Sequence, residues 1–243
     1  MRNYLLFQLQ GVLASWGEVV AGELRTSDNH PTRSALLGLI GAALGIERGD
    51  DARHQSLSRD LYIATLMHHT GVPLEDFHTT QTPDGNKGRE LANRTEELNY
   101  KSIATILSRR TYFCDQSMTV AVWHTSDNPT FTLATIASAL NAPKWTLSLG
   151  RKSCPLLTPP DARCIEAQDL KQAIEKNDFT MPLAFPSKEP RLYWDTTAPR
   201  SHIGLDAEFH ATRRDDVLSR KHWTFQDRHE SSARWTSQGG EKS

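Results

Sequence analysis

The order of hydrophobic patterns in the first 150 residues constrains the fold of this chain more than any other feature. Residues 4–10 alternate with a period of two, which predicts a β-strand. A helix is predicted to begin at Pro31 and Thr32 and to carry an apolar stripe as far as Leu44. Residues 61–68 predict a second strand, so the first unit has the order β-α-β.

The same order of patterns then follows a second time. Residues 118–123 predict an alternating strand, and apolar residues at helical spacing predict a helix between Pro129 and Pro143. Residues 145–149 predict a short final strand. Two consecutive β-α-β units on one sheet describe an α+β, ferredoxin-like fold of order β-α-β-β-α-β, which is also the topology of RNA-recognition (RRM) domains.

A long polar segment without clear periodicity, residues 77–108, separates the two units. A loop of this length inside a compact domain is usually functional or disordered. We therefore expect either a protruding arm that contacts a partner or a mobile surface excursion. Its basic residues include Lys87 and Arg89, and Lys87 lies in a glycine-flanked turn where a lysine suits a phosphate, although a plain turn is the simpler interpretation.

The chain divides into three predicted regions, which are a ferredoxin-like domain with the arm (residues 1–160), a smaller β-rich extension (161–230) and a disordered tail (231–243). Within the extension, residues 169–176 predict a short helix. Residues 191–195 and 223–226 predict strands.

Composition argues against several classes of protein. Cys114, Cys154 and Cys164 form no CxxC pair and no metal-ligand spacing, which indicates reduced thiols and predicts no metal or other cofactor. The longest apolar run, residues 35–46, falls short of the roughly 20 residues that span a bilayer, so we expect a cytoplasmic protein without a membrane partner. With 28 Lys and Arg against 29 Asp and Glu, any case for nucleic acid must come from local clusters.

Three local features indicate RNA. Residues 150–153 place a glycine, two cations and a hydroxyl after the last predicted strand, which makes a plausible phosphate cradle. Adjacent arginines at 109–110 precede an aromatic residue, a combination that can bind phosphates and stack on bases. An exposed indole at Trp16 could also stack, although burial in the core is an equal alternative. The candidate RNA-binding residues are Trp16, Arg33, Lys87, Arg89, Arg109, Arg110, Tyr112, Gly150, Arg151, Lys152 and Ser153.

Arg33 is a candidate for a different reason. It lies in the first turn of the first predicted helix, where a cation opposes the helix dipole. Its presence there predicts an anion from outside the helix, and a phosphate is the obvious choice.

Four segments, taken in order, resemble one protein family, and they are residues 11–17, 31–39, 108–115 and 149–155. They resemble the CasD or "Cas five" family of subunits of the type I-E CRISPR Cascade complex. The resemblance implies a ferredoxin-like domain that binds the 5′ handle of CRISPR RNA (crRNA). It implies a thumb-like arm, the 77–108 insertion, that interrupts pairing of the guide with target DNA. It also implies CasC backbone subunits, which the protein would cap, and the large CasA subunit as partners.

The resemblance implies no catalytic role, since RNA cleavage in this subtype belongs to CasE. The sequence also lacks the GxSxG, P-loop, Rossmann and HExxH motifs. Related subunits of another subtype cleave RNA with a tyrosine, lysine and histidine set, and no corresponding lysine–histidine pair occurs here. One alternative is a metal-independent endoribonuclease for CRISPR repeat RNA, with Tyr112 and His124 as acid and base. Another is a protein-interaction module that binds no RNA.

Overall fold

The computed structural model describes residues 1–243 except 18–21, 85–91, 101, 187–188 and 237–243. The strands of the described residues are β1 (Arg2–Ala14), β2 (Trp16–Gly17), β3 (Leu24–Arg25), β4 (Ser27–Asp28), β5 (Leu61–His69), β6 (Val72–Pro83), β7 (Ile103–His124), β8 (Arg163–Ala167), β9 (Arg191–Asp195), β10 (Phe209–Ser219) and β11 (Thr224–Arg234). Their helices are α1 (Arg33–Leu44), α2 (Asp51–Asp60), α3 (Arg94–Leu98), α4 (Leu133–Asn141), α5 (Leu170–Lys176) and α6 (Arg200–Ile203).

Strands from both halves of the chain form one large sheet with the order β10-β11-β9-β5-β7-β1-β8. Within it, β5, β7, β1 and β8 are antiparallel neighbours. The β10–β11 hairpin and β9 extend the sheet beyond β5. The fold is therefore α+β and mostly sheet. The C-terminal third is β-rich, as predicted, but its strands extend both edges of the sheet that the N-terminal strands form.

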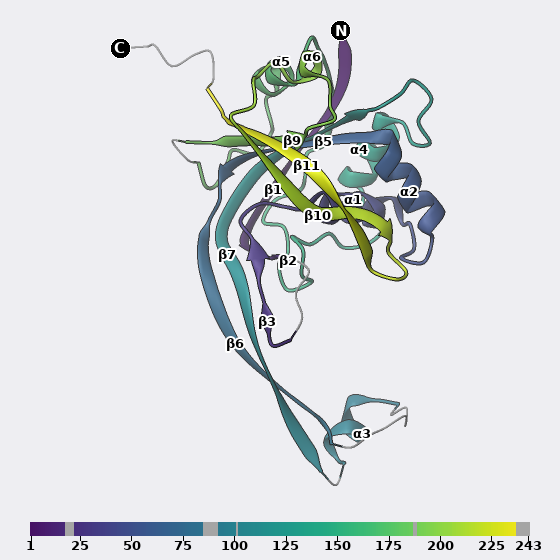
Figure 1. The fold of residues 1–243 in the computed structure, drawn as a ribbon, viewed down its shortest axis with the longest axis vertical. Helices are drawn as coiled ribbons and strands as arrows, with labels where there is room; N and C mark the ends of the chain where they lie inside the picture. Colours follow the sequence, from purple (N-terminus) through teal and green to yellow (C-terminus); the bar gives the residue numbers. More distant parts are fainter. Residues whose placement is uncertain (18–21, 85–91, 101, 187–188, 237–243) are drawn as a thin grey trace.

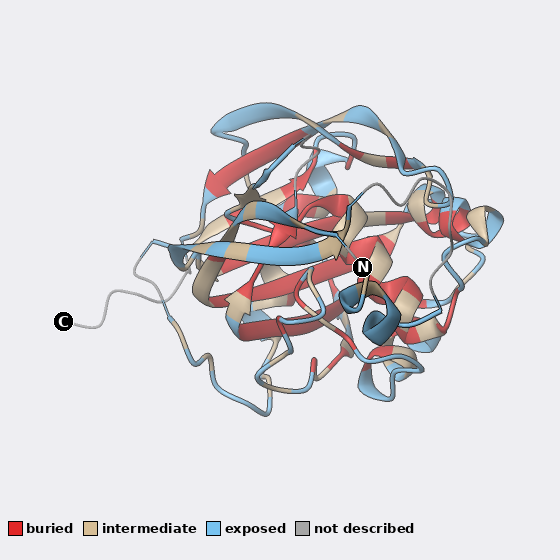
Figure 2. Cartoon of the chain, turned by 90° about the horizontal axis from the view of Figure 1, so that it is seen from below, coloured by how far each residue is buried: buried red, intermediate tan, exposed pale blue. Residues whose placement is uncertain are grey.

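Different helices cover the two faces of the sheet (Figure 1). Leu5, Phe7 and Leu9 of β1 are fully buried on the face covered by α1 and α4. Tyr4 and Leu6 point to the other face, where they pack with residues of α5 and α6. Each such side chain contributes about 1.5–3 kcal/mol by burial, and Figure 2 shows how the buried residues follow the central strands. None of the helices in the described ranges is long and apolar enough to cross a membrane.

The two predicted central helices are confirmed together with their start signals. Thr32 caps α1, because its side chain accepts a hydrogen bond from the Ala35 amide at 3.1 Å. The helix ends where Gly45 adopts a left-handed conformation, with φ of 69°. Thr132 caps α4 in the same way through the Thr135 amide. Each capping threonine directly precedes its helix in sequence, so the sequence alone carries the signal for both helix starts.

The predicted strand over residues 145–149 is wrong. Only Ser148 makes an isolated bridge there, to Pro155, and the edge of the sheet beside β1 belongs to β8 instead. Leu147 and Leu149 are buried as the apolar pattern suggested, but they reach the core from a loop. Burial of side chains alone does not decide between a strand and a packed loop.

The arm is an antiparallel β-ribbon and not an irregular loop. β6 and β7 pair from Val72 with Cys114 to Pro83 with Ile103, so the arm begins five residues earlier than the predicted 77. Figure 1 shows it extending away from the body of the molecule, with α3 near its far end. A two-stranded ribbon exposes both faces, so its sequence lacks the alternation that marks a half-buried strand.

The shorter C-terminal elements agree with prediction except at the end of the chain. α5 begins after its cap Asp169 and β9 spans Arg191–Asp195, as expected, while the strand predicted at 223–226 is the start of the longer β11. The predicted disordered tail from 231 is wrong for residues 231–234, which belong to β11. Ser231 is polar yet buried, because its hydroxyl bonds to Thr196 and His210 and its strand lies between β9 and β10.

Candidate nucleic-acid interface

The contact between Arg151 and Tyr112 is the centre of the candidate site. One guanidinium nitrogen of Arg151 donates to the Tyr112 hydroxyl at 3.3 Å, and the guanidinium carbon lies 5.0 Å from the ring centroid. Burial raises the pKa of Tyr112, but hydrogen bonds from Arg151 and Ser153 and the charge of Arg151 outweigh burial and lower it overall. The sequence predicted both residues as RNA-binding without relating them, and the structure brings them together. Tyr112 is buried in the core, with 8% of its surface exposed, so the prediction that its ring stacks on a base is wrong and the ring positions Arg151 instead.

Two further arginines lie beside this pair. β3 runs parallel to β7 with Arg25 opposite Arg110, and Arg151 donates its second terminal nitrogen to the Arg25 carbonyl at 3.3 Å. Arg110 and Tyr112 share one face of β7, since they are two residues apart. We call Arg25, Arg110 and Arg151 the arginine cluster. Among the residues that the structure describes, no carboxylate forms an ion pair with any of the three.

Arg109 does not join the arginine cluster. It follows the opposite alternation of β7, and its guanidinium lies 3.6 Å from Glu75 on the neighbouring strand β6. Its side chain is 60% exposed, so it remains accessible from solvent. The adjacent pair Arg109-Arg110 thus presents its charges on two sides of the arm and not on one. Lys87 and Arg89, the other predicted arm contacts, lie outside the described residues.

The loop after α4 requires the glycine that the sequence places there. Gly150 has φ of 87°, and a Cβ atom on it would lie 1.8 Å from the carbonyl oxygen of Ser15. The Ser15 amide also donates to the Leu149 carbonyl at 3.0 Å, which joins the loop to the end of β1. Lys152 and Ser153 follow on the surface and are exposed. The loop thus presents a lysine and a hydroxyl to solvent beside the arginine cluster.

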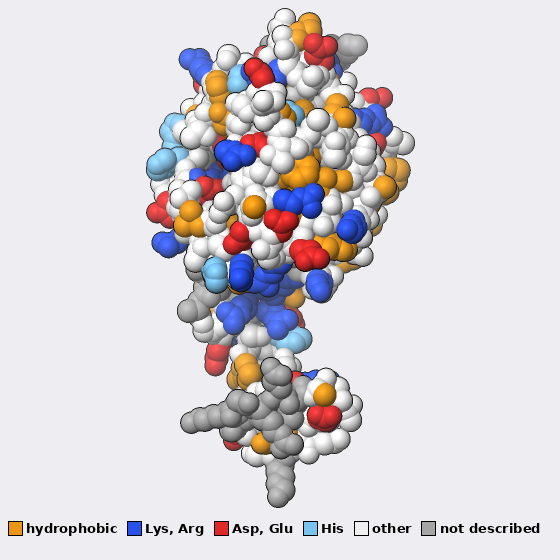
Figure 3. Space-filling view, turned by 90° about the vertical axis from the view of Figure 1, so that its right-hand side faces the viewer, with side chains coloured by type: hydrophobic (Ala, Val, Ile, Leu, Met, Phe, Trp, Pro, Cys, Tyr) orange, Lys and Arg blue, Asp and Glu red, His pale blue; other side chains and the backbone are white. Residues whose placement is uncertain are grey.

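A groove of about 1570 Å³ begins at this loop. One wall carries Arg25 and Arg151, and the floor is a face of α1 that includes Gly38. The β10–β11 hairpin forms a further wall, which carries Arg214 and Arg220. Figure 3 shows Lys and Arg side chains gathered where the arm meets the body of the molecule.

Sequence reasoning missed the hairpin wall, although a signal was present. Residues 213–214 and 220–221 are adjacent basic pairs, and aromatic residues follow at 223 and 225. This is the same combination of cations and aromatic rings that was noticed at 109–112. Arg25 carried no such signal, because only its pairing with β7 brings it to the site.

The prediction that Trp16 stacks on a base is wrong. Its side chain is buried, with 1% of its surface exposed, and its indole nitrogen donates to the side chain of Gln116 at 2.7 Å. Gln116 is itself fully buried and donates to the carbonyls of Asn29 and Thr70. A buried indole whose N–H is satisfied belongs to the core, so Trp16 holds the first loop against β7.

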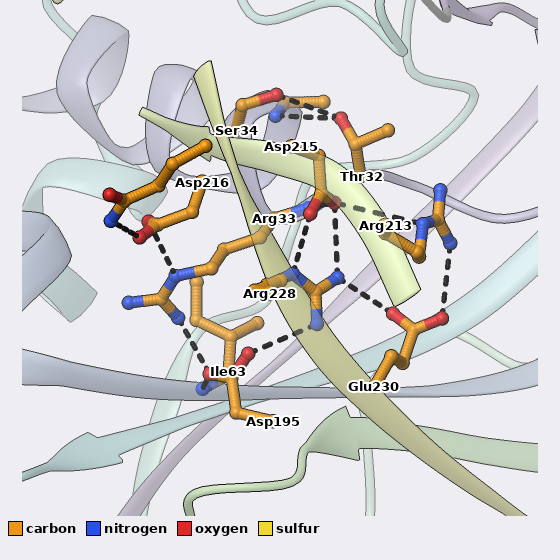
Figure 4. A network of polar contacts seen from close by, with 12 residues as sticks. Thr32, Arg33, Ser34, Ile63, Asp195, Arg213, Asp215, Asp216, Arg228 and Glu230 are labelled. Atoms are coloured by element: carbon orange, nitrogen blue, oxygen red, sulfur yellow. Dashed lines mark hydrogen bonds and ion pairs between the residues drawn. The ribbon is translucent and has the colours of Figure 1, made fainter. Parts of the chain in front are cut away.

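The prediction that Arg33 binds a phosphate is also wrong. Its guanidinium is buried and forms ion pairs with Asp195 at 2.6 Å and Asp216 at 3.6 Å (Figure 4). It also donates to the Leu61 carbonyl at 2.9 Å. The Arg33 amide, at the start of α1, donates to Asp215 at 2.8 Å. The helix start does attract anions, as the dipole argument required, but they are carboxylates from the C-terminal third.

These carboxylates belong to a buried network that fixes the β10–β11 hairpin to the body. Arg228 of β11 contacts Asp195, Asp215 and Glu230 at 3.2, 2.6 and 2.7 Å (Figure 4). Burial raises the pKa of Glu230, but the hydrogen bond from His30 and the nearby arginine charges outweigh burial and lower it to about 2. The hairpin wall of the groove is therefore positioned by ion pairs across the sheet.

His124 does not combine with Tyr112 in one active site. Its Nε2 lies 3.0 Å from the Phe131 carbonyl, next to the turn that leads to α4. Both residues belong to β7, and twelve residues of extended strand separate their Cα atoms by on the order of 40 Å. An acid and a base must both reach the same ribose and phosphate, so this pair cannot form the predicted endoribonuclease centre.

The fold and the site together define an α+β protein with a β-ribbon arm and a cation-rich groove at its base. The sequence profile of the family described as CRISPR-associated protein (Cas_Cas5) matches residues 4–229. The CRISPR system Cascade subunit CasD of Escherichia coli (strain K12) is 36% identical over 174 residues, which cover 72% of this chain and 76% of the relative. The chain therefore belongs to the Cas5 family of CRISPR-associated proteins.

Solved structures agree with this assignment. A chain of a CRISPR RNA-guided surveillance complex is 25% identical, with a TM-score of 0.65, and the match covers 95% of this chain and 89% of that one. A second structure, described as a Cas protein, is 22% identical with a TM-score of 0.65 over 96% of this chain and 95% of its own, and it supports the fold alone.

Proposed function

We propose that this protein is a non-catalytic subunit of a type I-E CRISPR Cascade complex and that it binds the 5′ handle of crRNA. The observation that carries the proposal is the arginine cluster around Tyr112 at the base of the arm, in a chain of the Cas5 family. Three cations without carboxylate partners among the described residues suit a phosphate backbone, and the buried Tyr112 ring holds one of them, Arg151, in place. The related CasD is a Cascade subunit.

The partners follow from the same proposal. The protein caps the CasC backbone, contacts the CasA subunit and takes part in crRNA-guided binding of target DNA. The β6–β7 arm is the element suited to reach over the guide, because it leaves the body as a ribbon directly beyond the arginine cluster. The strand order β8-β1-β7-β5, all antiparallel, supports a ferredoxin-like unit whose last strand is β8.

Arg151→Gln tests the proposed binding site. Loss of one phosphate contact weakens binding of the purified chain to single-stranded handle RNA and makes the slope of log affinity against log salt shallower by about 0.7. Arg200→Gln is the matched control, because Arg200 is 81% exposed on α6 and its removal changes the net charge by the same amount. Equal affinities and equal slopes for the two variants would reject the site.

A second measurement separates a binding subunit from a nuclease. We expect the purified chain to leave repeat RNA intact in the absence of metal, and His124→Ala to leave RNA affinity unchanged. Tyr112→Ala lowers affinity about as much as Arg151→Gln does, because the Tyr112 ring and hydroxyl hold the Arg151 guanidinium in place. Cleavage of repeat RNA that disappears in His124→Ala would overturn the non-catalytic assignment.

A further inference from the structure

An unusual tryptophan lies at the tip of the β10–β11 hairpin. Trp223 has φ of 52°, a conformation that bulky side chains rarely adopt, and it is the last residue of the turn 220–223, which begins with Arg220. Despite this backbone geometry its side chain is 55% exposed, so packing in the core does not explain its position. A left-handed residue is common in a hairpin turn, so the turn accounts for the backbone of Trp223, and the exposed ring is the feature that needs an explanation.

The indole is held in place by its neighbours. The Arg48 guanidinium lies 4.3 Å from the ring centroid, and the same arginine donates from Nε to the Arg220 carbonyl at 3.3 Å. The ring of Phe225 lies nearly parallel to the indole, with an interplanar angle of 27° and centroids 5.8 Å apart. This offset arrangement makes one extended aromatic surface from two rings.

The hairpin tip is also fixed against the floor of the groove. The Arg220 side chain donates to the Ser34 carbonyl at the start of α1. It lies directly over Gly38, where a Cβ atom would come within 2.9 Å of a guanidinium nitrogen. Burial and the charge of Arg48 lower the pKa of Arg220 to about 10, so it remains a cation at neutral pH. Gly38 therefore allows the cation and the aromatic pair to approach the helix.

Trp223 and Phe225 line the same groove as Arg25 and Arg151 of the arginine cluster, and they do so from the β10–β11 hairpin. A single-stranded RNA whose phosphates follow Arg25 and Arg151 presents its bases away from those cations, across the groove. Aromatic rings that face a cationic track are the arrangement by which proteins bind splayed, single-stranded bases.

We infer that the Trp223–Phe225 pair stacks on a base of the bound RNA, so the groove is closed by a base-binding wall from the C-terminal hairpin. This inference rests on the proposed function, because it assigns residues to the same RNA. It adds that one nucleotide is held by its base from the β10–β11 side while the arginine cluster holds the backbone.

The test uses the full chain and single-stranded handle RNA with 2-aminopurine at one position at a time. In the wild type, saturating protein quenches the label strongly at the stacked position, and Trp223→Ala removes this quenching. Trp223→Ala lowers affinity about five- to 150-fold, while Trp223→Phe keeps most of it because a ring remains. Phe209→Ala is the matched control, since Phe209 is an exposed aromatic of the same hairpin that does not line this groove.

The outcomes distinguish this inference from the proposed function. If the wild type binds no RNA, both fail. If the wild type binds and Arg151→Gln weakens binding, but Trp223→Ala matches Phe209→Ala in affinity and quenching, only the stacking inference fails. Normal RNA binding by Trp223→Ala together with lost assembly into the complex would make the aromatic pair a protein contact and would also overturn it. Thermal unfolding of each variant shows that the hairpin remains folded.

Discussion

Arg33→Ala tests whether Arg33 is a structural residue or an RNA ligand. The side chain is 9% exposed, and its removal leaves Asp195 and Asp216 without one of their cations and the Leu61 carbonyl without a donor. Breaking a buried ion pair by deleting one partner destabilises a protein by about 3–5 kcal/mol, because the remaining charge stays desolvated. For a chain of this size each kcal/mol lowers the melting temperature by about 2–4 °C, so we expect a decrease of about 6–20 °C.

Urea denaturation and thermal unfolding of the purified chain measure this loss. Arg200→Ala is the control, because Arg200 is 81% exposed, its partner Asp206 is 72% exposed, and such a surface ion pair is worth about 0–1 kcal/mol. Arg33→Lys keeps the charge but loses the planar fork that contacts several acceptors, so it recovers only part of the stability. An Arg33→Ala protein as stable as the wild type, with weaker RNA binding at equal folded fraction, would refute the structural role and restore the phosphate contact.

Three further predictions concern the loop, the ion pairs and the arm. Gly150→Ala lowers the melting temperature and weakens RNA binding together, since its Cβ atom meets the Ser15 carbonyl; unchanged values for both would show that the loop can move. The folded-state pKa of Glu230 lies near 2, below its ordinary value, so its stabilising contribution is present above pH 4.5 and lost as the pH falls towards 2; Glu230→Gln should flatten that part of a stability–pH curve. Replacing residues 79–105 by a short Gly/Ser linker leaves cooperative unfolding intact, because no described residue there belongs to either core cluster. The same replacement impairs assembly of the complex or binding of target DNA. Loss of cooperative unfolding would show instead that the arm is part of the core.

The parts of the fold that the sequence predicted well are those determined by neighbouring residues. β1, α1, β5 and α4 each carry their own burial pattern, and both helices carry a capping threonine at the start. The predicted strand over residues 191–195 has the same bounds as β9, because its own pattern of buried residues marks it. The arm was predicted as an insertion but not as a ribbon, because the pairing of β6 with β7 leaves no periodic mark when both faces are solvated.

The errors in the candidate site have one physical origin. The sequence predicted that Arg33 needs an anion and that the Trp16 ring is either stacked or buried. The partner of Arg33 is Asp195 and the partner of Trp16 is Gln116, and each lies more than 90 residues away in sequence. Local electrostatics predicts that an anion or an acceptor must be present and does not predict which molecule supplies it. A cation at a helix start is therefore evidence for a nearby anion, and only the fold decides whether a carboxylate already occupies that place.

Arg110 and Tyr112 owe their position to β7. The part of this strand that follows Asp115 pairs with β1 and β5 in the core. The part that precedes Asp115 pairs with β6 and forms one strand of the arm. Asp115 itself has φ of 61°. The His69 ring contacts the Asp115 carbonyl at 2.7 Å, so the point where the strand leaves the sheet is tied to the end of β5. Arg110 and Tyr112 lie on the arm side of this point, within five residues of it. Because the arm is the continuation of a central strand, packing of the core fixes the direction of the arm and the place of the arginine cluster together.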